Sequence, residues 1–225
     1  MKILAIETSG EHGSVALLTG ESILGQALEG HARHSAHLLP AIRQLLDEAG
    51  MSLTQLDALA FGAGPGAFTG LRLACGVVQG LALGTGLPVV PVCSLQALAL
   101  KAPPGPTLVA MDARMGEIYA AAYVNDDCEP VESMAPCCIP PEDLRVPQGE
   151  GWNGIGSGFA AYPTRMPSAI LAALKTLDEQ RTPTASDIAR IASLKAARGE
   201  TLSAALAAPI YVRDKVALTT AERLA

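Results

Sequence analysis

The feature of this sequence that most constrains its fold is a glycine-rich stretch, FGAGPGAFTGLR, at residues 61–72. It separates an apolar run at residues 56–61 from a run with helical spacing at residues 71–83. Glycine permits positive φ and leaves room where a Cβ would collide with a neighbour. A strand that turns into a helix through so much glycine brings its backbone close to another group, which is either a bound phosphate or a packed chain.

Neither of the two common nucleotide-binding loop motifs fits this stretch. A P-loop requires G-x-x-x-x-G-K-[ST], and the stretch contains no lysine. The dinucleotide motif requires G-x-G-x-x-G with an acidic residue about 20 positions later. Gly64, Gly66 and Gly70 are spaced one residue too widely, and residues 71–92 contain no Asp or Glu. We therefore expect a tight structural turn that leads into a packed helix, with a phosphate-binding loop as the alternative.

Composition places this chain of 225 residues among globular proteins of one large or two small domains. Hydrophobic residues make up 49% and aromatic residues only 4%, so small aliphatic side chains must build the core. We expect a cytoplasmic protein, because no uninterrupted apolar run could span a membrane, no signal peptide opens the chain and the five cysteines form no C-x-x-C. With a net charge of −6 and dispersed cations, contact with RNA is expected only through a partner.

Hydrophobic periodicity predicts an α/β fold built in two halves. Expected strands are 2–7, 14–18, 22–28, 56–61, 88–92, 107–111, 117–124 and 131–139; expected helices are 35–49, 69–83, 94–100, 140–144 and 188–197, with a loop at 154–158. The proline-rich segment 102–106 marks the expected boundary between a first lobe, residues 1–101, and a smaller second lobe, residues 102–225, whose last residues pack back or are disordered. The order strand, polar turn, strand opens both halves, which indicates a duplicated unit.

Three histidines, His31, His34 and His37, form the pattern H-x-x-H-x-x-H. Histidines three residues apart can share a helix face and bind a metal ion. This run straddles the expected start of a helix, and no carboxylate accompanies it. We therefore expect solvated or capping histidines and no metal, with a metal site as the alternative.

Acidic residues end the first strand of each half. Glu7 is followed by Thr8 and Ser9, and Asp112 occupies the matching place beside Arg114. Acidic residues at strand ends beside a cleft support magnesium and phosphate chemistry in α/β folds, whereas Asp and Thr also bond to the backbone of their own turns. These five residues are candidate contacts to a cleft or to a vestigial nucleotide site. No spacing indicates a nucleophile with its base, so no catalytic residue is assigned.

The expected helix at residues 69–83 leads into a run of evenly spaced glycines. Gly76, Gly80 and Gly84 are four residues apart, and Leu73 and Val77 share their side. Each glycine inside a helix costs up to about 1 kcal/mol. Several on one face indicate close approach of another helix, either within this fold or across a seam between molecules.

Four motifs occur in order along the chain: ILAIETS at 3–9, HSAHLLP at 34–40, GPGAFTGLR at 64–72 and DARMGEIY at 112–119, followed by PIYVR at 209–213. Together they closely resemble the bacterial TsaB family, also called YeaZ, although residues 125–205 carry little of the resemblance. The resemblance implies an α/β fold of the actin-like ATPase superfamily with two duplicated ribonuclease-H-like lobes. It also implies a role in forming threonylcarbamoyladenosine at position 37 of tRNAs.

The resemblance further implies a subunit without catalysis or cofactor of its own. The related catalytic family, TsaD, binds metal through H-x-x-x-H and has later glycine-rich nucleotide loops, and this chain lacks both. The expected partners are a TsaD-type transferase and a TsaE-type ATPase, with a homodimer when the chain is alone and tRNA contacted only indirectly.

The resemblance places the partner interface on the two expected helices 35–49 and 69–83. The predicted interface residues are Leu38, Leu39, Ile42, Leu45, Leu46, Arg72, Leu73, Gly76, Val77 and Gly80. Two alternatives stay open. One is an active Mg-ATP-dependent ATPase or kinase of the same superfamily, suggested by Glu7, Thr8 and Ser9 facing Asp112 across a cleft. The weaker one is a metallopeptidase, suggested by the histidine run.

Overall fold

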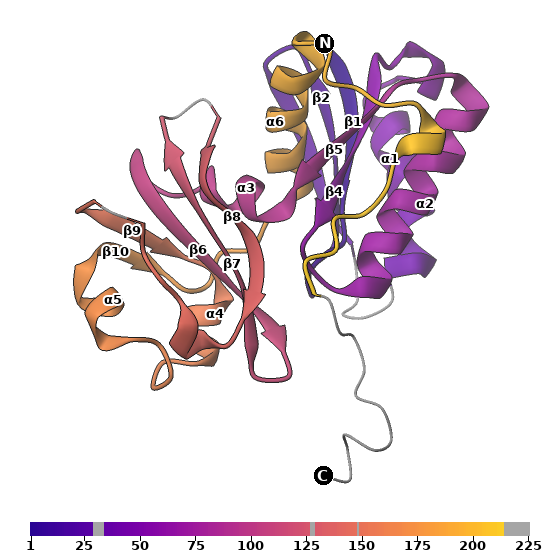
Figure 1. Ribbon diagram of the computed structural model, residues 1–225. Helices are drawn as coiled ribbons and strands as arrows, with labels where there is room; N and C mark the ends of the chain where they lie inside the picture. Colours follow the sequence, from indigo (N-terminus) through magenta and orange to yellow (C-terminus); the bar gives the residue numbers. More distant parts are fainter. Residues whose placement is uncertain (29–33, 127–128, 148, 214–225) are drawn as a thin grey trace, which may run out of the picture.

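The computed structural model describes residues 1–28, 34–126, 129–147 and 149–213, which form two five-stranded sheets side by side (Figure 1). The first sheet contains β1 (Lys2–Glu7), β2 (Ser14–Thr19), β3 (Ser22–Ala27), β4 (Ala58–Gly64) and β5 (Val89–Cys93) in the order β3-β2-β1-β4-β5. The strand β1 is antiparallel to β2 and parallel to β4.

The second sheet repeats this arrangement. It contains β6 (Gly105–Arg114), β7 (Glu117–Asn125), β8 (Val131–Ile139), β9 (Trp152–Ile155) and β10 (Leu174–Asp178) in the order β10-β9-β6-β7-β8. The strand β6 is antiparallel to β7 and parallel to β9, as β1 is to β2 and β4. The expected duplication of one α/β unit is therefore confirmed.

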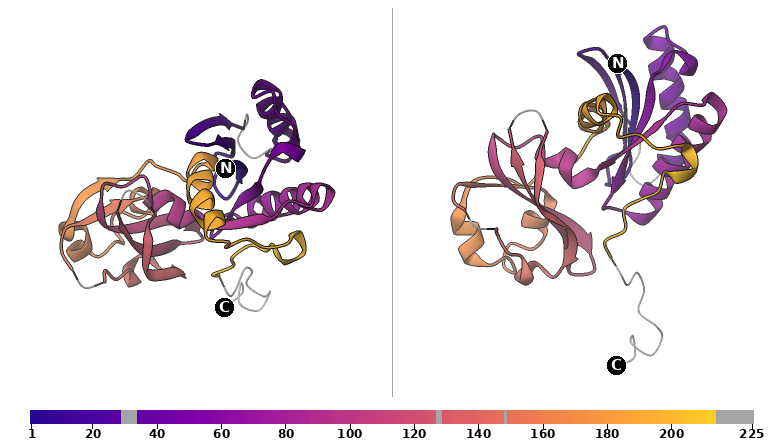
Figure 2. Two further views of the ribbon diagram at one scale, coloured as in Figure 1. Left: turned by 90° about the horizontal axis from the view of Figure 1, so that it is seen from above. Right: turned by 45° about the horizontal axis from the view of Figure 1, so that its top comes forward.

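Helices cover both faces of the first sheet (Figure 2). On one face lie α1 (His34–Glu48) and α2 (Phe68–Thr85), whose inward apolar residues pack with the side chains of β1 and β4. On the other face lies α6 (Ala185–Ala197), where Ile188 and Ile191 pack against Ile3 and Val90. Thr184 and Asp187 form the capping box that begins α6.

Two helices each follow one sheet in the chain and pack against the other sheet. The short helix α3 (Ser94–Ala99) follows the first sheet but buries Leu95 and Leu98 against the second. In turn, α6 follows the second sheet but packs on the first. The division at residue 101 stays a prediction, and these contacts argue that the first lobe also includes residues 185–213.

In the part of the chain after β8, the sequence patterns did not indicate β9, β10, α4 (Ser157–Ala161) or α5 (Ser168–Ala173). The expected helix at 140–144 is a single 3₁₀ turn, η2 (Pro141–Asp143). The expected loop at 154–158 is wrong, because its glycines serve close packing. Gly156 has φ of 116°, and a Cβ there would lie 2.4 Å from the carbonyl oxygen of Ala110. Gly154 similarly leaves room for Leu174. Glycine in a strand or turn marks close approach of another backbone as readily as it marks a loop.

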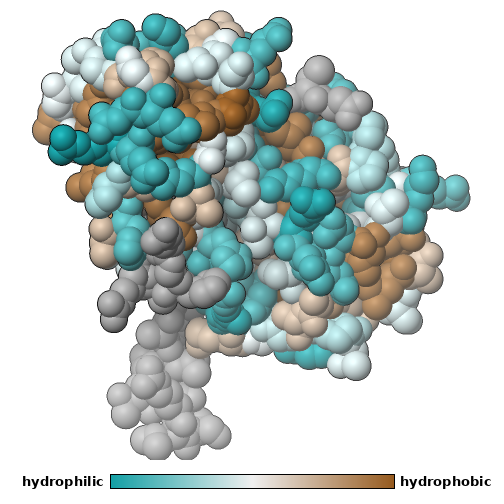
Figure 3. Space-filling view, turned by 180° about the vertical axis from the view of Figure 1, so that it is seen from behind, coloured by the Kyte–Doolittle hydropathy of each residue, from teal (hydrophilic) through white to brown (hydrophobic). Residues whose placement is uncertain are grey.

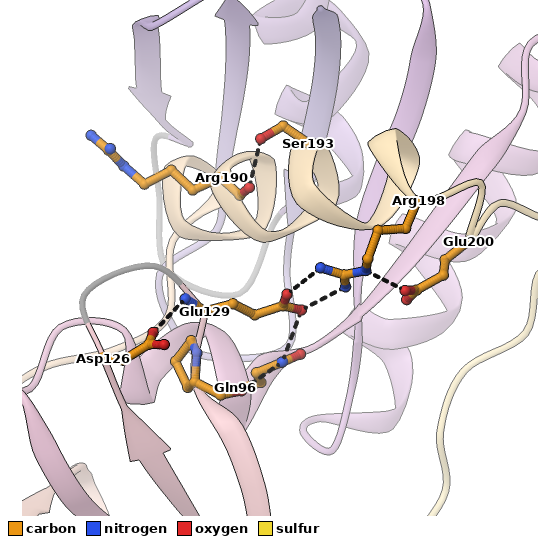
Figure 4. Close-up of polar contacts among 8 residues, drawn as sticks. Gln96, Asp126, Glu129, Arg190, Ser193, Arg198 and Glu200 are labelled. Atoms are coloured by element: carbon orange, nitrogen blue, oxygen red, sulfur yellow. Dashed lines mark hydrogen bonds and ion pairs between the residues drawn. The ribbon is translucent and has the colours of Figure 1, made fainter.

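Ion pairs and hydrogen bonds join the lobes at the end of α6 (Figure 4). Arg198 donates from Nη1 and Nη2 to the two carboxylate oxygens of Glu129, at 2.6 and 3.1 Å, and its Nε pairs with Glu200. Gln96 of α3 donates from Nε2 to the carbonyl oxygen of Pro130 at 2.9 Å. Glu129 and Pro130, which precede β8, are thereby held by α3 and by the end of α6.

The C-terminal segment, defined here as residues 199–213, returns along α2. It includes the 3₁₀ turn η3 (Ala204–Leu206) and an antiparallel bridge between Leu202 and Val89. Gln79 of α2 donates from Nε2 to the carbonyl oxygen of Ala207 at 2.9 Å, and the N–H of Ile210 donates to Ala63 at 2.7 Å. The described chain thus passes the start of α2 and ends at Arg213, whose guanidinium contacts the β6–β7 turn of the second lobe.

Candidate functional site

The glycine-rich stretch packs directly against the turn that follows β1. The N–H of Ala67 donates to the carbonyl oxygen of Ser9, and Thr8 donates from Oγ1 to the carbonyl oxygen of Gly70, both at 2.7 Å. A Cβ at Gly70 would lie 1.8 Å from the carbonyl oxygen of Thr8, and one at Gly66 would lie 2.5 Å from the Cβ of Ser9. Chain-to-chain packing therefore accounts for these glycines, as the structural turn predicts.

A cleft of about 1320 Å³ opens between the lobes at this turn. Its walls come from the β1–β2 turn, the start of α2, the β6–β7 turn and the C-terminal segment. Four of the five candidate cleft residues, Thr8, Ser9, Asp112 and Arg114, line it. The duplication explains this, because each lobe contributes its equivalent hairpin turn to one wall.

The fifth candidate, Glu7, lies beneath the cleft and does not line it. Its fully buried carboxylate accepts hydrogen bonds from the N–H of Ser9 at 2.5 Å and the Oγ of Ser94 at 2.8 Å. Gly62 provides the space, since a Cβ there would lie 2.0 Å from Oε2 of Glu7. Burial raises the pKa of Glu7, and the hydrogen bonds from Ser9 and Ser94 oppose this shift. The expected ligand contact at Glu7 is contradicted, because the carboxylate faces the interior.

Asp112 and Arg114 stabilise the β6–β7 turn. Asp112 Oδ1 accepts hydrogen bonds from the N–H of Arg114 at 2.8 Å and the hydroxyl of Tyr162 at 2.9 Å, and Arg114 Nη1 lies 3.0 Å from Asp112 Oδ2. Arg114 and Met115 have positive φ, 61° and 56°. Arg114 also pairs with Glu11 of the equivalent turn in the first lobe, so an ion pair joins the two turns. Of the two roles that the sequence suggested for Asp112, these contacts correspond to bonding within its own turn and not to metal or phosphate binding.

Several buried polar side-chain atoms at the cleft lack a hydrogen-bond partner among the described residues. Among the described residues, three buried side-chain atoms have no hydrogen-bond partner: Ser9 Oγ, His34 Nδ1 and Arg213 Nε. All three residues line the cleft. Because buried polar groups are normally hydrogen-bonded, the lining of this cleft is the part of the described molecule best suited to a polar ligand.

The histidine run divides between a structural contact and the surface. His34 begins α1, its Nε2 lies 3.3 Å from the carbonyl oxygen of Gly10, and its ring packs where a Cβ on Gly13 would stand. His37 is half-buried in the same helix, and His31 lies outside the described residues. Within the described ranges, no three His, Cys, Asp or Glu side chains could together hold a metal ion.

The outer face of α2 has no partner in the described part of this chain. At Gly76, Gly80 and Gly84, a Cβ would have no heavy atom within 4 Å beyond the helix's own backbone, and the side chain of Leu83 is 82% exposed. Packing within the fold therefore does not explain these glycines, in contrast to Gly66 and Gly70 at the start of the same helix.

The ten predicted interface residues separate into a buried and an outward group. Four of them are at most 7% exposed in the core between α1 and the sheet: Leu38, Ile42, Leu45 and Leu46. Their assignment to an interface is corrected, because a regular apolar stripe on a helix faces its own sheet first. The others are exposed or half-buried: Leu39, Arg72, Leu73, Gly76, Val77 and Gly80. Exposed apolar side chains are visible on the first lobe, at the left of Figure 3.

The C-terminal segment is the part of the site that sequence reasoning missed. The sequence indicated only that the last residues pack back or are disordered, yet Ile210, Tyr211 and Arg213 line the cleft. Arg213 donates from Nη2 to Glu117 Oε2 at 2.6 Å and to the carbonyl oxygen of Ala113 at 3.0 Å. The one available signal was the motif at 209–213, which carries no packing information by itself.

Comparison with known proteins agrees with this architecture. The family model described as TsaD, tRNA N6-adenosine threonylcarbamoyltransferase, matches residues 29–220. The tRNA threonylcarbamoyladenosine biosynthesis protein TsaB of Escherichia coli is 37% identical over 96% of both chains, and that of Haemophilus influenzae is 34% identical over 96% of this chain and 95% of its own. The solved structure of YeaZ from Pseudomonas aeruginosa superposes with a TM-score of 0.86 at 40% identity, covering 93% of this chain and 99% of the other.

Two duplicated lobes, each built on a mixed five-stranded sheet and each turning an equivalent hairpin toward one cleft, define a two-lobed α/β protein. Within that class, the chain belongs to the TsaB family, whose curated relatives are named as tRNA threonylcarbamoyladenosine biosynthesis proteins. No helix in the described ranges is long and apolar enough to cross a membrane.

Proposed function

We propose that this protein is a non-catalytic subunit that binds and supports a TsaD-type threonylcarbamoyl transferase in forming threonylcarbamoyladenosine on tRNA. The observation that carries the proposal is the outer face of α2, where a Cβ on Gly76, Gly80 or Gly84 would have no neighbour among the described residues. Each glycine costs up to about 1 kcal/mol inside a helix. Since no contact in the described part of the chain offsets this cost, close approach of a second molecule explains it.

A helix of the partner packed on this face would bring backbone against backbone at the glycines. Apolar side chains that are exposed or half-buried add to this surface: Leu73, Val77 and Leu83 on α2 and Leu39 on α1. Burying such surface contributes about 25 cal/mol per Å² of apolar area removed from water. The glycines would add dispersion contacts that larger side chains would prevent.

The wider assembly follows from the same surface. A TsaE-type ATPase would join the pair, and two copies of this chain would meet through the same helices when the transferase is absent. A net charge of −6 favours tRNA contact through the transferase rather than through this chain. The assembly would act in the cytoplasm without a cofactor bound to this subunit.

Affinity for the TsaD-type protein of the same cell tests the proposal. Gly80→Leu places a bulky side chain on the seam, where nothing in the described chain obstructs it, so the fold should survive while partner affinity falls at least about tenfold. Arg190→Leu is the matched control, because it adds an exposed leucine to α6 on the opposite face of the sheet. Equal affinity of Gly80→Leu and the wild-type protein would refute the proposed seam. Assay of tRNA modification with and without this chain checks the supporting role.

An active Mg-ATP-dependent enzyme is the second candidate function. The observation favouring it is the cleft, in which Thr8, Ser9, Asp112 and Arg114 come together. Weighing against it, Asp112 already pairs with Arg114 and Tyr162. Calorimetry of the isolated chain with Mg-ATP separates the candidates: tight binding and turnover, both lost in Ser9→Ala, would establish the enzyme and displace the scaffold proposal.

A further inference from the structure

The chain's two exposed aromatic residues lie against each other. All eight Phe, Tyr and Trp residues fall in the described ranges, and six of them are buried or half-buried. The two exceptions are Phe68, 41% exposed in the first turn of α2, and Tyr211, 52% exposed in the C-terminal segment. Their ring centroids are 5.6 Å apart, although 143 positions separate them in the sequence. A chain with so few aromatics has placed its exposed pair at one point of its surface.

Arg72 joins this pair into one cluster. Its Nε donates to the hydroxyl of Tyr211 at 3.1 Å, and its guanidinium carbon lies 3.8 Å from the centroid of the Phe68 ring. Within the described ranges, Arg72 forms no ion pair with a carboxylate. Its charge is therefore held in a fixed place without a counter-ion among the described residues, where it can donate hydrogen bonds to a carboxylate.

The cluster is held in place before any partner arrives. The residue before Tyr211 is tied to the end of β4 through the hydrogen bond from Ile210 to Ala63, and Arg213 anchors the other side on Glu117 and Ala113. Side chains that are already ordered lose little conformational entropy on binding. This is the property expected of anchor residues in an interface.

The cluster also continues the surface proposed above. Arg72 precedes Gly76 by four residues and Gly80 by eight, so all three follow one another on the outer face of α2. Tyrosine and arginine are enriched among residues that dominate binding energy, and aromatic side chains are enriched in interface cores. Glycines supply close approach along α2, whereas the cluster supplies large side chains at its end.

We propose that Phe68, Arg72 and Tyr211 form the energetic centre of the partner-binding surface, and that they take an apolar side chain flanked by a carboxylate from the partner protein. This proposal rests on the proposed function and adds the C-terminal segment to the interface. A stacked RNA base fits the cluster less well, because Arg72 already covers one face of the Phe68 ring and the net charge of the chain is −6.

The test measures affinity for the purified TsaD-type subunit by calorimetry at two salt concentrations. Tyr211→Ala and Phe68→Ala should each weaken binding at least about 30-fold, the range of anchor residues. Tyr211→Phe keeps the ring and should weaken it only a few-fold. Arg72→Gln should also reduce the dependence of affinity on salt, since it removes the proposed charge pair. Leu206→Ala is the control, because Leu206 is 67% exposed on the same segment outside the cluster.

The outcomes separate this proposal from the one on which it rests. Thermal unfolding of each isolated variant first confirms that the fold is retained. If Gly80→Leu loses affinity while Tyr211→Ala and Phe68→Ala bind as the wild-type protein does, the cluster is not the energetic centre and the proposed function still holds. If all three variants bind with wild-type affinity, both the cluster proposal and the proposed function are wrong. Unchanged affinity for the transferase with lost tRNA binding by the assembled complex assigns the cluster to RNA and overturns it as a protein-binding centre.

Discussion

The hydroxyl of Thr8 donates a hydrogen bond to the carbonyl oxygen of Gly70, while the carbonyl oxygen of Thr8 occupies the place where a Cβ on Gly70 would stand. The two residues are 62 positions apart, and each sits where a β-strand gives way to a turn or a helix. One wall of the cleft and the first turn of α2 are thereby fixed by the same contact. Substitutions along α2 should consequently have opposite effects on stability at its start and at its middle.

Gly70→Ala should strongly destabilise the protein. The added Cβ would stand 1.8 Å from a backbone oxygen, which cannot swing away as the end of a flexible side chain can. We expect the free energy of unfolding to fall by about 3 kcal/mol or more, or the variant to fail to fold. Urea unfolding followed by circular dichroism measures this. A loss below about 1 kcal/mol would show that the turn and α2 are less tightly packed than described.

Gly76→Ala and Gly80→Ala should instead stabilise the isolated chain. Both positions are helical and open, so alanine gains helix propensity without a clash, up to about 1 kcal/mol each. Midpoint temperatures should rise by about 2–4 °C per kcal/mol for a chain of this size. If a partner helix packs on this face, the same variants should bind the transferase less tightly. Higher stability with unchanged affinity would mean that the glycines serve no interface.

Local patterns predicted much of the fold because the spacing of apolar residues marks its strands and main helices. The bounds of β1 and β8 match the expected strands 2–7 and 131–139, and α6 contains the expected helix 188–197. Those patterns cannot say which sheet a helix covers. The packing of α6 on the first sheet depends on contacts between residues more than 100 positions apart, such as the N–H of Ala185 donating to Ser14 Oγ.

Candidate site residues were predicted where chemistry and topology coincided, and missed where only packing decided. Thr8, Ser9, Asp112 and Arg114 were expected at a cleft because equivalent turns of a duplicated unit face each other, and all four line it. Glu7 was misplaced because strand alternation alone does not reveal that Gly62 leaves a buried space for its carboxylate. The contribution of Tyr211 depends on the fold-back of the C-terminal segment, for which the sequence has no local signal.

Stability should depend on the protonation of Glu7. Burial raises its pKa in the folded state above the ordinary value of about 4.5, so the folded state holds the proton more tightly than the unfolded state. The contribution is therefore fully present below that ordinary value and is lost as pH rises through the folded-state pKa, by about 1.4 kcal/mol for each unit of difference.

Glu7→Gln isolates this effect, because glutamine keeps the shape and cannot ionise. Relative to the variant, the wild-type protein should lose stability as pH increases from about 4.5 toward neutrality. Urea unfolding of both proteins across this range gives the difference directly and cancels the titration of other carboxylates. A difference that does not change with pH would show that the pKa of Glu7 is the same in both states.

Attachment of the C-terminal segment to α2 should depend on Gln79. Its Nε2 donates to the carbonyl oxygen of Ala207 at 2.9 Å, and the other donor to that oxygen is the thiol of Cys75 at 3.5 Å, a weak one. Gln79→Ala should cost about 1 kcal/mol and favour release of the segment. A broad-specificity protease should then cut residues 199–213 several-fold faster. Gln44→Ala is the matched control, because among the described residues the exposed side chain of Gln44 on α1 bonds only to the side chain of Gln26. Faster cleavage with unchanged transferase affinity would separate the anchoring of the segment from partner binding. Equal cleavage of both variants would show that Gln79 is not needed to hold the segment. Its remaining contacts, the bridge between Leu202 and Val89 and the hydrogen bond from Ile210 to Ala63, would then be sufficient.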